Sequence, residues 1–212
     1  LTCLDPTCLD PVRLDPVGSA LSVKILSGLS IVCPSISLSV FLCIFLRFPT
    51  SSKDFATTRQ SLPTESMTVS AWVSVDTPRQ WGGIIGTIQD NGNLEQGWVL
   101  GYDDHTFYFA LATKGADDGN GLMTYLKAKT RYIPGKLYHV TAVYDGKTME
   151  LYINGKRETT SAVQSGAILY PKAAPYVIGA YRDSDEFHPH HGRIHEIKLY
   201  GEAAKANWVA QE

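Results

Sequence analysis

Residues 137–155, LYHVTAVYDGKTMELYING, decide the fold of this 212-residue chain. Two segments of alternating apolar and polar residues flank the dipeptide Asp145-Gly146, and the second segment ends at Asn154-Gly155. Both dipeptides tolerate the positive φ angles that tight hairpin turns require. The pattern therefore predicts an antiparallel meander within an all-β domain.

The sequence around this stretch continues the same pattern. Residues 67–75, MTVSAWVSV, alternate so that Met67, Val69 and Val73 face one way and Thr68 and Ser74 the other. Further strands are expected at 83–88, 97–102, 106–113, 123–128, 158–163, 176–181 and 193–200, and one or two closing helical turns at 203–211. About ten short strands without a long helical pattern predict an antiparallel two-sheet β-sandwich or jelly roll over residues 62–212.

Composition limits the organisation and the partners. A chain of 212 residues with 44% hydrophobic content can bury one good core. The net charge of −2 and the absence of a basic run argue against nucleic acid as a partner. All 4 cysteines lie within residues 1–43, so the strand-rich part contains no disulfide and depends on its core.

The N-terminal quarter differs in character. Residues 1–20 carry three Leu-Asp-Pro units and are expected to form an irregular low-complexity tail. The hydrophobic segment 21–48 contains an uncharged run, 25–46, that would span about 33 Å as a helix. We expect a signal peptide or a membrane anchor, with the domain secreted or anchored on the extracytoplasmic side. A buried segment of a larger fold and non-genuine coding sequence are the alternatives. Residues 49–61 are expected to be a linker or a degenerate first strand.

A polar cluster at residues 183–195, DSDEFHPHHGRIH, could hold a metal ion. Asp183 and Asp185, together with Asp90 of a second oxygen-rich loop, offer the carboxylate oxygens that calcium prefers. The histidines do not follow a standard zinc spacing. The alternative is that both loops are solvated turns in which Asp and Asn bond their own backbone.

Aromatic side chains offer a second kind of site, because their faces can stack on sugar rings. The candidates are Trp81, Trp98, Tyr102, Tyr125, Tyr170, Tyr181 and Phe187, of which we expect Trp81, Trp98, Tyr102, Tyr181 and Phe187 to bind ligand. Trp72 is expected in the core. Core packing is the alternative for each candidate, since large aromatic residues dominate burial.

Catalytic patterns are missing from the sequence. Glycoside hydrolases on jelly rolls place paired acids on one strand face, and no such E-x-D-x-E spacing occurs here. There is also no Ser-His-Asp order, P-loop, Gly-x-Gly-x-x-Gly or Cys-x-x-Cys pair. The chain is therefore predicted to be non-catalytic.

The ordered set of strand motifs resembles the bacterial branch of the laminin-G-like, concanavalin A-like jelly-roll domains. The matching segments are Ser70-Ala71-Trp72-Val73, Gly82-Gly83-Ile84-Ile85, Tyr138-His139-Val140, Tyr144-Asp145-Gly146, Leu151-Tyr152-Ile153-Asn154-Gly155, Val177-Ile178-Gly179-Ala180 and Gly192-Arg193-Ile194-His195-Glu196. His195 stands where a carboxylate is common in the family. The whole run also looks like the domain attached to calcineurin-like metallophosphoesterases.

This resemblance implies a concanavalin A-like jelly roll that acts as a recognition module and binds carbohydrate. The alternative is a structural or protein-interaction domain accessory to a separate hydrolase of the metallophosphoesterase type. Related jelly rolls bind Ca²⁺ at their loops, which adds to the expectation for Asp90, Asp183 and Asp185. The expected partners are thus a glycan or a neighbouring enzyme domain.

Overall fold

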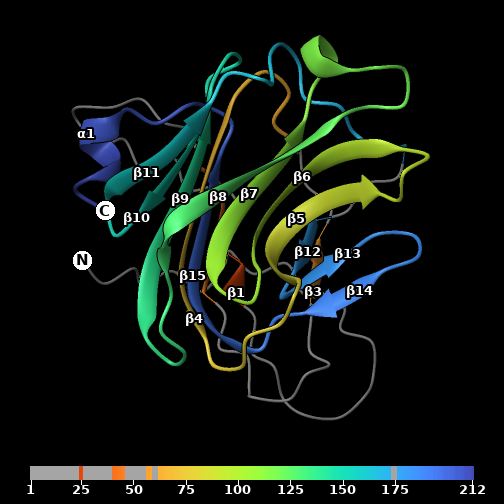
Figure 1. Ribbon diagram of the computed structural model, residues 1–212. Coiled ribbons are helices and arrows are strands. Elements are labelled where there is room, and N and C mark those ends of the chain that lie inside the picture. The colour runs from red at the N-terminus through yellow and green to blue at the C-terminus, as the bar shows by residue number, and fades with distance from the viewer. Residues whose placement is uncertain (1–23, 26–39, 46–55, 59–61, 173–175) are drawn as a thin grey trace.

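The computed structural model describes residues 24–25, 40–45, 56–58, 62–172 and 176–212 and shows two antiparallel sheets packed face to face (Figure 1). The seven-stranded sheet has the order β1 (Lys24–Ile25), β2 (Val40–Phe45), β15 (Gly192–Tyr200), β4 (Met67–Val75), β9 (Leu137–Tyr144), β10 (Met149–Ile153) and β11 (Lys156–Ser161). The six-stranded sheet has the order β3 (Ala56–Thr58), β12 (Tyr176–Ile178), β5 (Gly82–Asp90), β6 (Glu95–Tyr102), β7 (Thr106–Ala112) and β8 (Met123–Arg131). The predicted two-sheet sandwich is confirmed.

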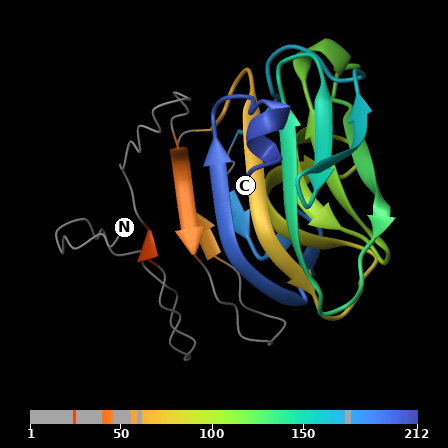
Figure 2. The same ribbon diagram turned by 90° about the vertical axis from the view of Figure 1, so that its left-hand side faces the viewer.

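Three smaller elements complete the described chain. Strands β13 (Ala180–Arg182) and β14 (Phe187–Pro189) form a two-stranded sheet. The 3-10 turn η1 covers Lys114–Ala116, and the short helix α1 covers Ala206–Val209. Figure 2 shows β2, β15 and β4 side by side, with α1 on the outer surface of their sheet.

The predicted meander is present as β9, β10 and β11, which are neighbours in the seven-stranded sheet. Asn154 and Gly155 connect β10 to β11 with φ angles of 51° and 75°. These positive values at both central positions are those of the hairpin turn that Asn-Gly favours. The Asn154 side-chain oxygen also accepts a hydrogen bond from the His139 backbone N–H at 2.9 Å, which ties the turn to β9.

The strand expected at 176–181 is split, and the cause is a close approach between backbones. The chain turns at Gly179, where φ is 81°, and β13 then crosses the outer side of β5. A Cβ atom on Gly83 would lie 1.8 Å from the Tyr181 backbone nitrogen. Only glycine at position 83 lets β13 lie so close to β5, and this contact between distant segments has no local sequence signal.

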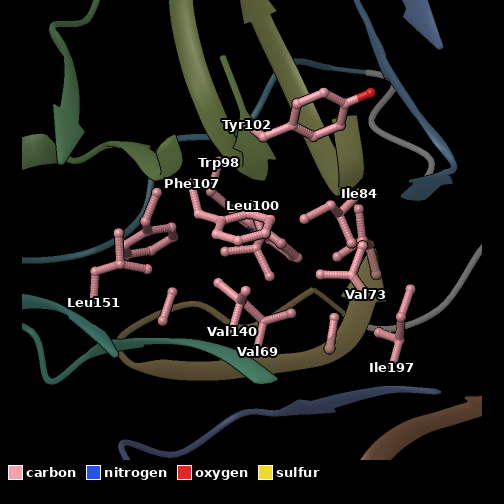
Figure 3. Packing of buried hydrophobic residues seen from close by; sticks show 14 of the residues in the cluster. Val69, Val73, Ile84, Trp98, Leu100, Tyr102, Phe107, Val140, Leu151 and Ile197 are labelled. Atoms are coloured by element: carbon pink, nitrogen blue, oxygen red, sulfur yellow. The ribbon is translucent and has the colours of Figure 1, made fainter. Parts of the chain in front are cut away.

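The core lies between the two sheets (Figure 3). The seven-stranded sheet contributes Val69, Val73, Val140, Leu151 and Ile197, and the six-stranded sheet contributes Ile84, Trp98, Leu100 and Phe107. All of these side chains are fully buried. The period-two alternation of β4 and β9 thus places one face of each strand in the core, as predicted.

The hydrophobic N-terminal segment is only partly within the described residues. Val40–Phe45 forms strand β2, which pairs antiparallel with β15. These six residues belong to a sheet and not to a helix. Within the described part of the chain, no helix has the length and apolar character needed to cross a bilayer. The tail at 1–20 lies outside the described residues.

Candidate functional site

The two outer faces of the sandwich are covered differently. On the seven-stranded sheet, the C-terminal segment packs Ala204 and Val209 against Val143 and Tyr152. The Thr68 hydroxyl fixes this segment by donating to the Glu202 carbonyl at 2.7 Å and accepting from the Ala204 N–H at 2.8 Å. This face is therefore occupied in part by the chain itself.

The outer face of the six-stranded sheet carries a cluster of aromatic rings. We call Trp81, Tyr108, Tyr125 and Tyr181 the aromatic face; they pack with Ile88, Val99, Ala110 and Met123 in a cluster separate from the main core. The Trp81 ring centroid lies 5.8 Å from that of Tyr108 in an edge-on contact and 5.6 Å from that of Tyr125. Tyr108 and Tyr125 are 5.5 Å apart.

The strand register builds this face. Tyr108 of β7 stands opposite Gly101 of β6, and Tyr125 of β8 stands opposite Ala110 of β7. A Cβ atom on Gly101 would lie 2.6 Å from the Tyr108 hydroxyl, so the glycine leaves room for the ring to lie across the sheet. Small residues beneath large rings thus give a packed aromatic layer in which Trp81 and Tyr125 remain partly exposed while Tyr108 and Tyr181 are buried.

Two loops that are far apart in sequence meet at the edge of the aromatic face. The Tyr125 hydroxyl donates a hydrogen bond to the Asp90 carboxylate. The Asp90 backbone N–H donates to Asp183 Oδ2 at 3.3 Å, and Gln89 Nε2 donates to Ser184 Oγ at 2.7 Å. The two oxygen-rich loops of the sequence therefore form one polar rim, and Asp90 connects it to the rings.

A charged pair also lies beside Trp81. Lys127 Nζ is 5.8 Å from the Trp81 ring centroid, which is a cation–π distance, and 2.8 Å from Asp103 Oδ2. Burial works to raise the pKa of Asp103, but Lys127 and the backbone N–H groups of Thr106 and His105 lower it overall. The Asp103 carboxylate is therefore ionised at neutral pH.

The tyrosine hydroxyls of the aromatic face stay protonated. Burial is the main cause that raises the pKa of Tyr108, Tyr125 and Tyr181, and the negative charge of Asp90 raises all three further. Protonated hydroxyls can donate hydrogen bonds, as Tyr125 does to Asp90. The Tyr108 hydroxyl is buried and has no hydrogen-bond partner among the described residues.

The structure separates the five predicted aromatic ligand residues. Trp81 lies on the aromatic face and is partly exposed, and Tyr181 lies there with 3% of its surface exposed. Phe187 is 42% exposed and stands on β14. These placements give Trp81 the strongest claim to contact a ligand.

The prediction for Trp98 and Tyr102 is wrong, because both side chains are fully buried. The Trp98 indole N–H donates to the Tyr170 hydroxyl at 3.1 Å, which in turn donates to the Pro63 carbonyl at 2.7 Å. Tyr102 accepts a hydrogen bond from the His191 N–H at 2.8 Å, and burial raises its pKa to about 12. Neither ring can stack on a sugar from these positions.

The predicted calcium ligands take part in turn formation. Asp183 Oδ1 accepts hydrogen bonds from the backbone N–H groups of Asp185 at 3.1 Å and Glu186 at 2.7 Å. Its Oδ2 faces the Asp90 N–H, so both carboxylate oxygens already have protein donors. In the ranges that the structure describes, no group of three His, Cys, Asp or Glu side chains is placed to hold a metal ion. Ca²⁺ binding therefore stays a prediction without geometric support.

Sequence reasoning missed Tyr108 and Lys127 and misplaced Trp72. Alternation in β7 could have shown Tyr108, because its neighbours Phe107 and Phe109 face the core. Trp72 is partly exposed on the outer face of the seven-stranded sheet and stacks on His139 at 4.9 Å, although a core position was expected. The alternation of Ala71 and Val73 already places Trp72 on the opposite side.

The chain belongs to the concanavalin A-like lectin/glucanases superfamily, since residues 49–210 match its laminin-G family model. The match begins before the domain boundary at 62 expected from the sequence, and it includes β3. The resemblance inferred from the strand motifs is confirmed.

The chain is also similar to curated proteins in sequence and to solved structures in fold. The chain is 28% identical over 150 residues to pappalysin-1 of Mus musculus and 27% identical to that of Homo sapiens; the match covers 66% of this chain and 9% of each relative. The structure of the CBM40 of the Ruminococcus gnavus IT-sialidase bound to α2,3 sialyllactose has a TM-score of 0.58 at 14% identity, over 70% of this chain and 82% of that chain. A putative carbohydrate binding protein of Bacteroides ovatus has a TM-score of 0.57 at 18% identity, over 74% of this chain and 44% of that chain.

Proposed function

We propose that this domain is a non-catalytic carbohydrate-recognition module that binds sugar at the aromatic face. The observation that carries the proposal is Trp81, a partly exposed indole held in place by Tyr108 and Tyr125. The names of its structural neighbours, which include a carbohydrate-binding module solved with a sialylated ligand, support the same class of ligand.

The binding chemistry follows from the neighbours of Trp81. The C–H face of a sugar ring packs against the indole, and its hydroxyl groups donate to the carboxylates of the rim. Tyr125 links the two parts, because its ring touches Trp81 and its hydroxyl binds Asp90. Since the rings are packed before ligand arrives, little side-chain entropy is lost on binding.

The test compares two partly exposed tryptophans on opposite faces. Glycans are first found on an array, and binding is then measured by calorimetry for the wild type, Trp81→Ala and Trp72→Ala. We expect Trp81→Ala to weaken binding at least about tenfold, as loss of a central aromatic contact does, and Trp72→Ala to bind like the wild type. Unchanged binding by a folded Trp81→Ala protein, checked by circular dichroism, would contradict the proposal.

A second candidate is an accessory domain that contacts a neighbouring enzyme domain. It is favoured by the match to pappalysin-1, in which the matching region is 9% of the whole protein. In that case the folded domain binds no glycan on the array but co-purifies with a catalytic domain encoded in the same gene or beside it. Glycan binding that depends on Trp81 would argue against this candidate.

A further inference from the structure

We propose that the aromatic face selects uncharged glycans and discriminates against acidic sugars such as sialic and uronic acids. This inference rests on the proposed function, because it concerns the ligand class of the same site. It is carried by the charges around Trp81: the rim is acidic, and Lys127, which lies over the indole, is paired with Asp103.

The rim supplies hydrogen-bond acceptors and negative charge. Asp90 is linked to Trp81 through a single side chain, since the Tyr125 ring is 5.6 Å from the indole and its hydroxyl binds Asp90. Asp183 Oδ2 accepts a hydrogen bond from the Asp90 backbone N–H at 3.3 Å. Hydroxyl groups of a neutral sugar can donate to these carboxylates, whereas a sugar carboxylate has no proton to donate and is repelled.

The lysine over the Trp81 ring is already paired. Lys127 lies over the Trp81 ring, but its Nζ contacts Asp103 Oδ2 at 2.8 Å. A sugar carboxylate would have to compete with Asp103 for this ammonium group. Recognition of an acidic sugar usually employs a free cation or an arginine fork, and the described contacts place neither against Trp81.

The negative charges that act on the tyrosines of the aromatic face also disfavour a bound anion. Asp90, Asp103, Asp183 and Glu186 all act to raise pKa values of tyrosines of the aromatic face, so the negative potential reaches the ring layer itself. Asp90 raises the pKa of Tyr108, Tyr125 and Tyr181 together, while Asp103 has the larger effect on Tyr108 and Asp183 on Tyr181. An anion placed on the rings enters this potential.

The experiment uses matched pairs of neutral and acidic glycans. The full chain is tested on an array carrying lactose with α2,3-sialyllactose, and neutral glucans with polyglucuronate. We expect the neutral member of each pair to bind at least about fivefold more tightly, a difference that shrinks at high salt because charge repulsion is screened. Tighter binding of the acidic members overturns this inference and leaves the proposed function standing. Binding to no glycan overturns both.

A pair of neighbouring aspartates supplies the matched variants. Asp103→Asn keeps Oδ1, which accepts from the His105 and Thr106 N–H groups, and removes the charge that neutralises Lys127. We expect this variant to bind the acidic glycans about two- to fivefold better relative to their neutral partners. Asp104→Asn removes an adjacent exposed charge that is not paired with Lys127 and serves as the control. An unchanged preference in Asp103→Asn would contradict the role given to the pair.

Discussion

At the scale of single residues, burial separates side chains of the same chemical type. Trp81, directly before β5, and Trp98, within β6, are both tryptophans beside a glycine, yet one is partly exposed on the aromatic face and the other is fully buried between the sheets. The same distinction separates Phe187, which is 42% exposed, from Phe107 in the core. A ring must be at least partly exposed to contact a ligand.

We predict that Trp98→Ala lowers the free energy of unfolding by about 3–5 kcal/mol, because it leaves a large cavity and removes the hydrogen bond to Tyr170. Phe187→Ala should cost less than about 1 kcal/mol, since its ring is already in part exposed. Urea denaturation of both variants measures the difference. Equal costs would mean that the Trp98 ring is not part of the core.

His190 gives the fold a sensitivity to acid. Its ring is buried, Nε2 lies 3.0 Å from the Ser74 carbonyl oxygen, and burial lowers its pKa from 6.5 to about 4. The unfolded chain therefore binds a proton at higher pH than the folded protein does. The neutral ring contributes full stability above about pH 6.5, and this contribution is lost as the pH falls from 6.5 towards 4.

We predict that the wild type loses roughly 3 kcal/mol more stability than His190→Gln between pH 6.5 and 4, the amount that this pKa difference represents. Urea denaturation at several pH values measures both curves. His191→Gln is the control at the neighbouring position, where the side chain is less buried. Parallel curves for the wild type and His190→Gln would show that His190 does not cause the acid sensitivity.

At the scale of elements, a carboxylate connects the edges of the two sheets. β8 and β11 are edge strands of different sheets. Glu158 on β11 accepts hydrogen bonds from the backbone N–H groups of Lys129 at 2.9 Å and Thr130 at 2.6 Å, and from the Thr130 hydroxyl at 2.8 Å. The side chain thus satisfies donors of β8 that no neighbouring strand accepts, and it blocks this edge against pairing with another chain.

We predict that Glu158→Ala lowers the free energy of unfolding by about 1–3 kcal/mol, because three donors lose a charged acceptor. Hydrogen exchange of the Lys129 and Thr130 amides should become faster. Lys156→Ala, an exposed position on the same strand, should change stability by less than about 0.5 kcal/mol. Unchanged exchange at Lys129 and Thr130 would remove Glu158 from this role.

At the scale of the whole molecule, sheet pairing extends upstream of residue 62, where the sequence predicts the domain to begin. β3 pairs with β12 through Thr58, Thr57 and Ala56, which oppose Tyr176, Val177 and Ile178. Removing β3 would expose the edge of β12, and an open edge favours aggregation.

We predict that a chain of residues 62–212 melts roughly 2–5 °C below a chain of residues 49–212, since loss of an edge strand costs about 1–2 kcal/mol in a domain of this size. Differential scanning calorimetry compares the two, and light scattering reports aggregation of the shorter chain. Identical melting temperatures would place the domain boundary at 62, as the sequence alone suggested.

The sequence by itself determined most of the strands from residue 67 onwards, the hairpins of the meander and the fold class. Alternation in Met67–Val75 and the turns at Asp145-Gly146 and Asn154-Gly155 act within a few residues, so their physical causes are visible in the sequence. The family resemblance and the lack of known catalytic motifs are likewise read from local sequence patterns. A turn does follow Asp90 and a turn does contain Asp183, as expected, although Asp90 itself is the last residue of β5.

Only the tertiary structure decided which of these residues form a site. The contact between β13 and Gly83, the joining of the Asp90 and Asp183 loops, and the packing of Trp81 on Tyr108 and Tyr125 all bring together residues from separate strands. Period-two alternation assigns a side chain to one face of a strand, but it does not say which face is covered by another sheet. Burial is a property of that covering, and for this reason Trp98 became a core residue and Trp81 the centre of the candidate site.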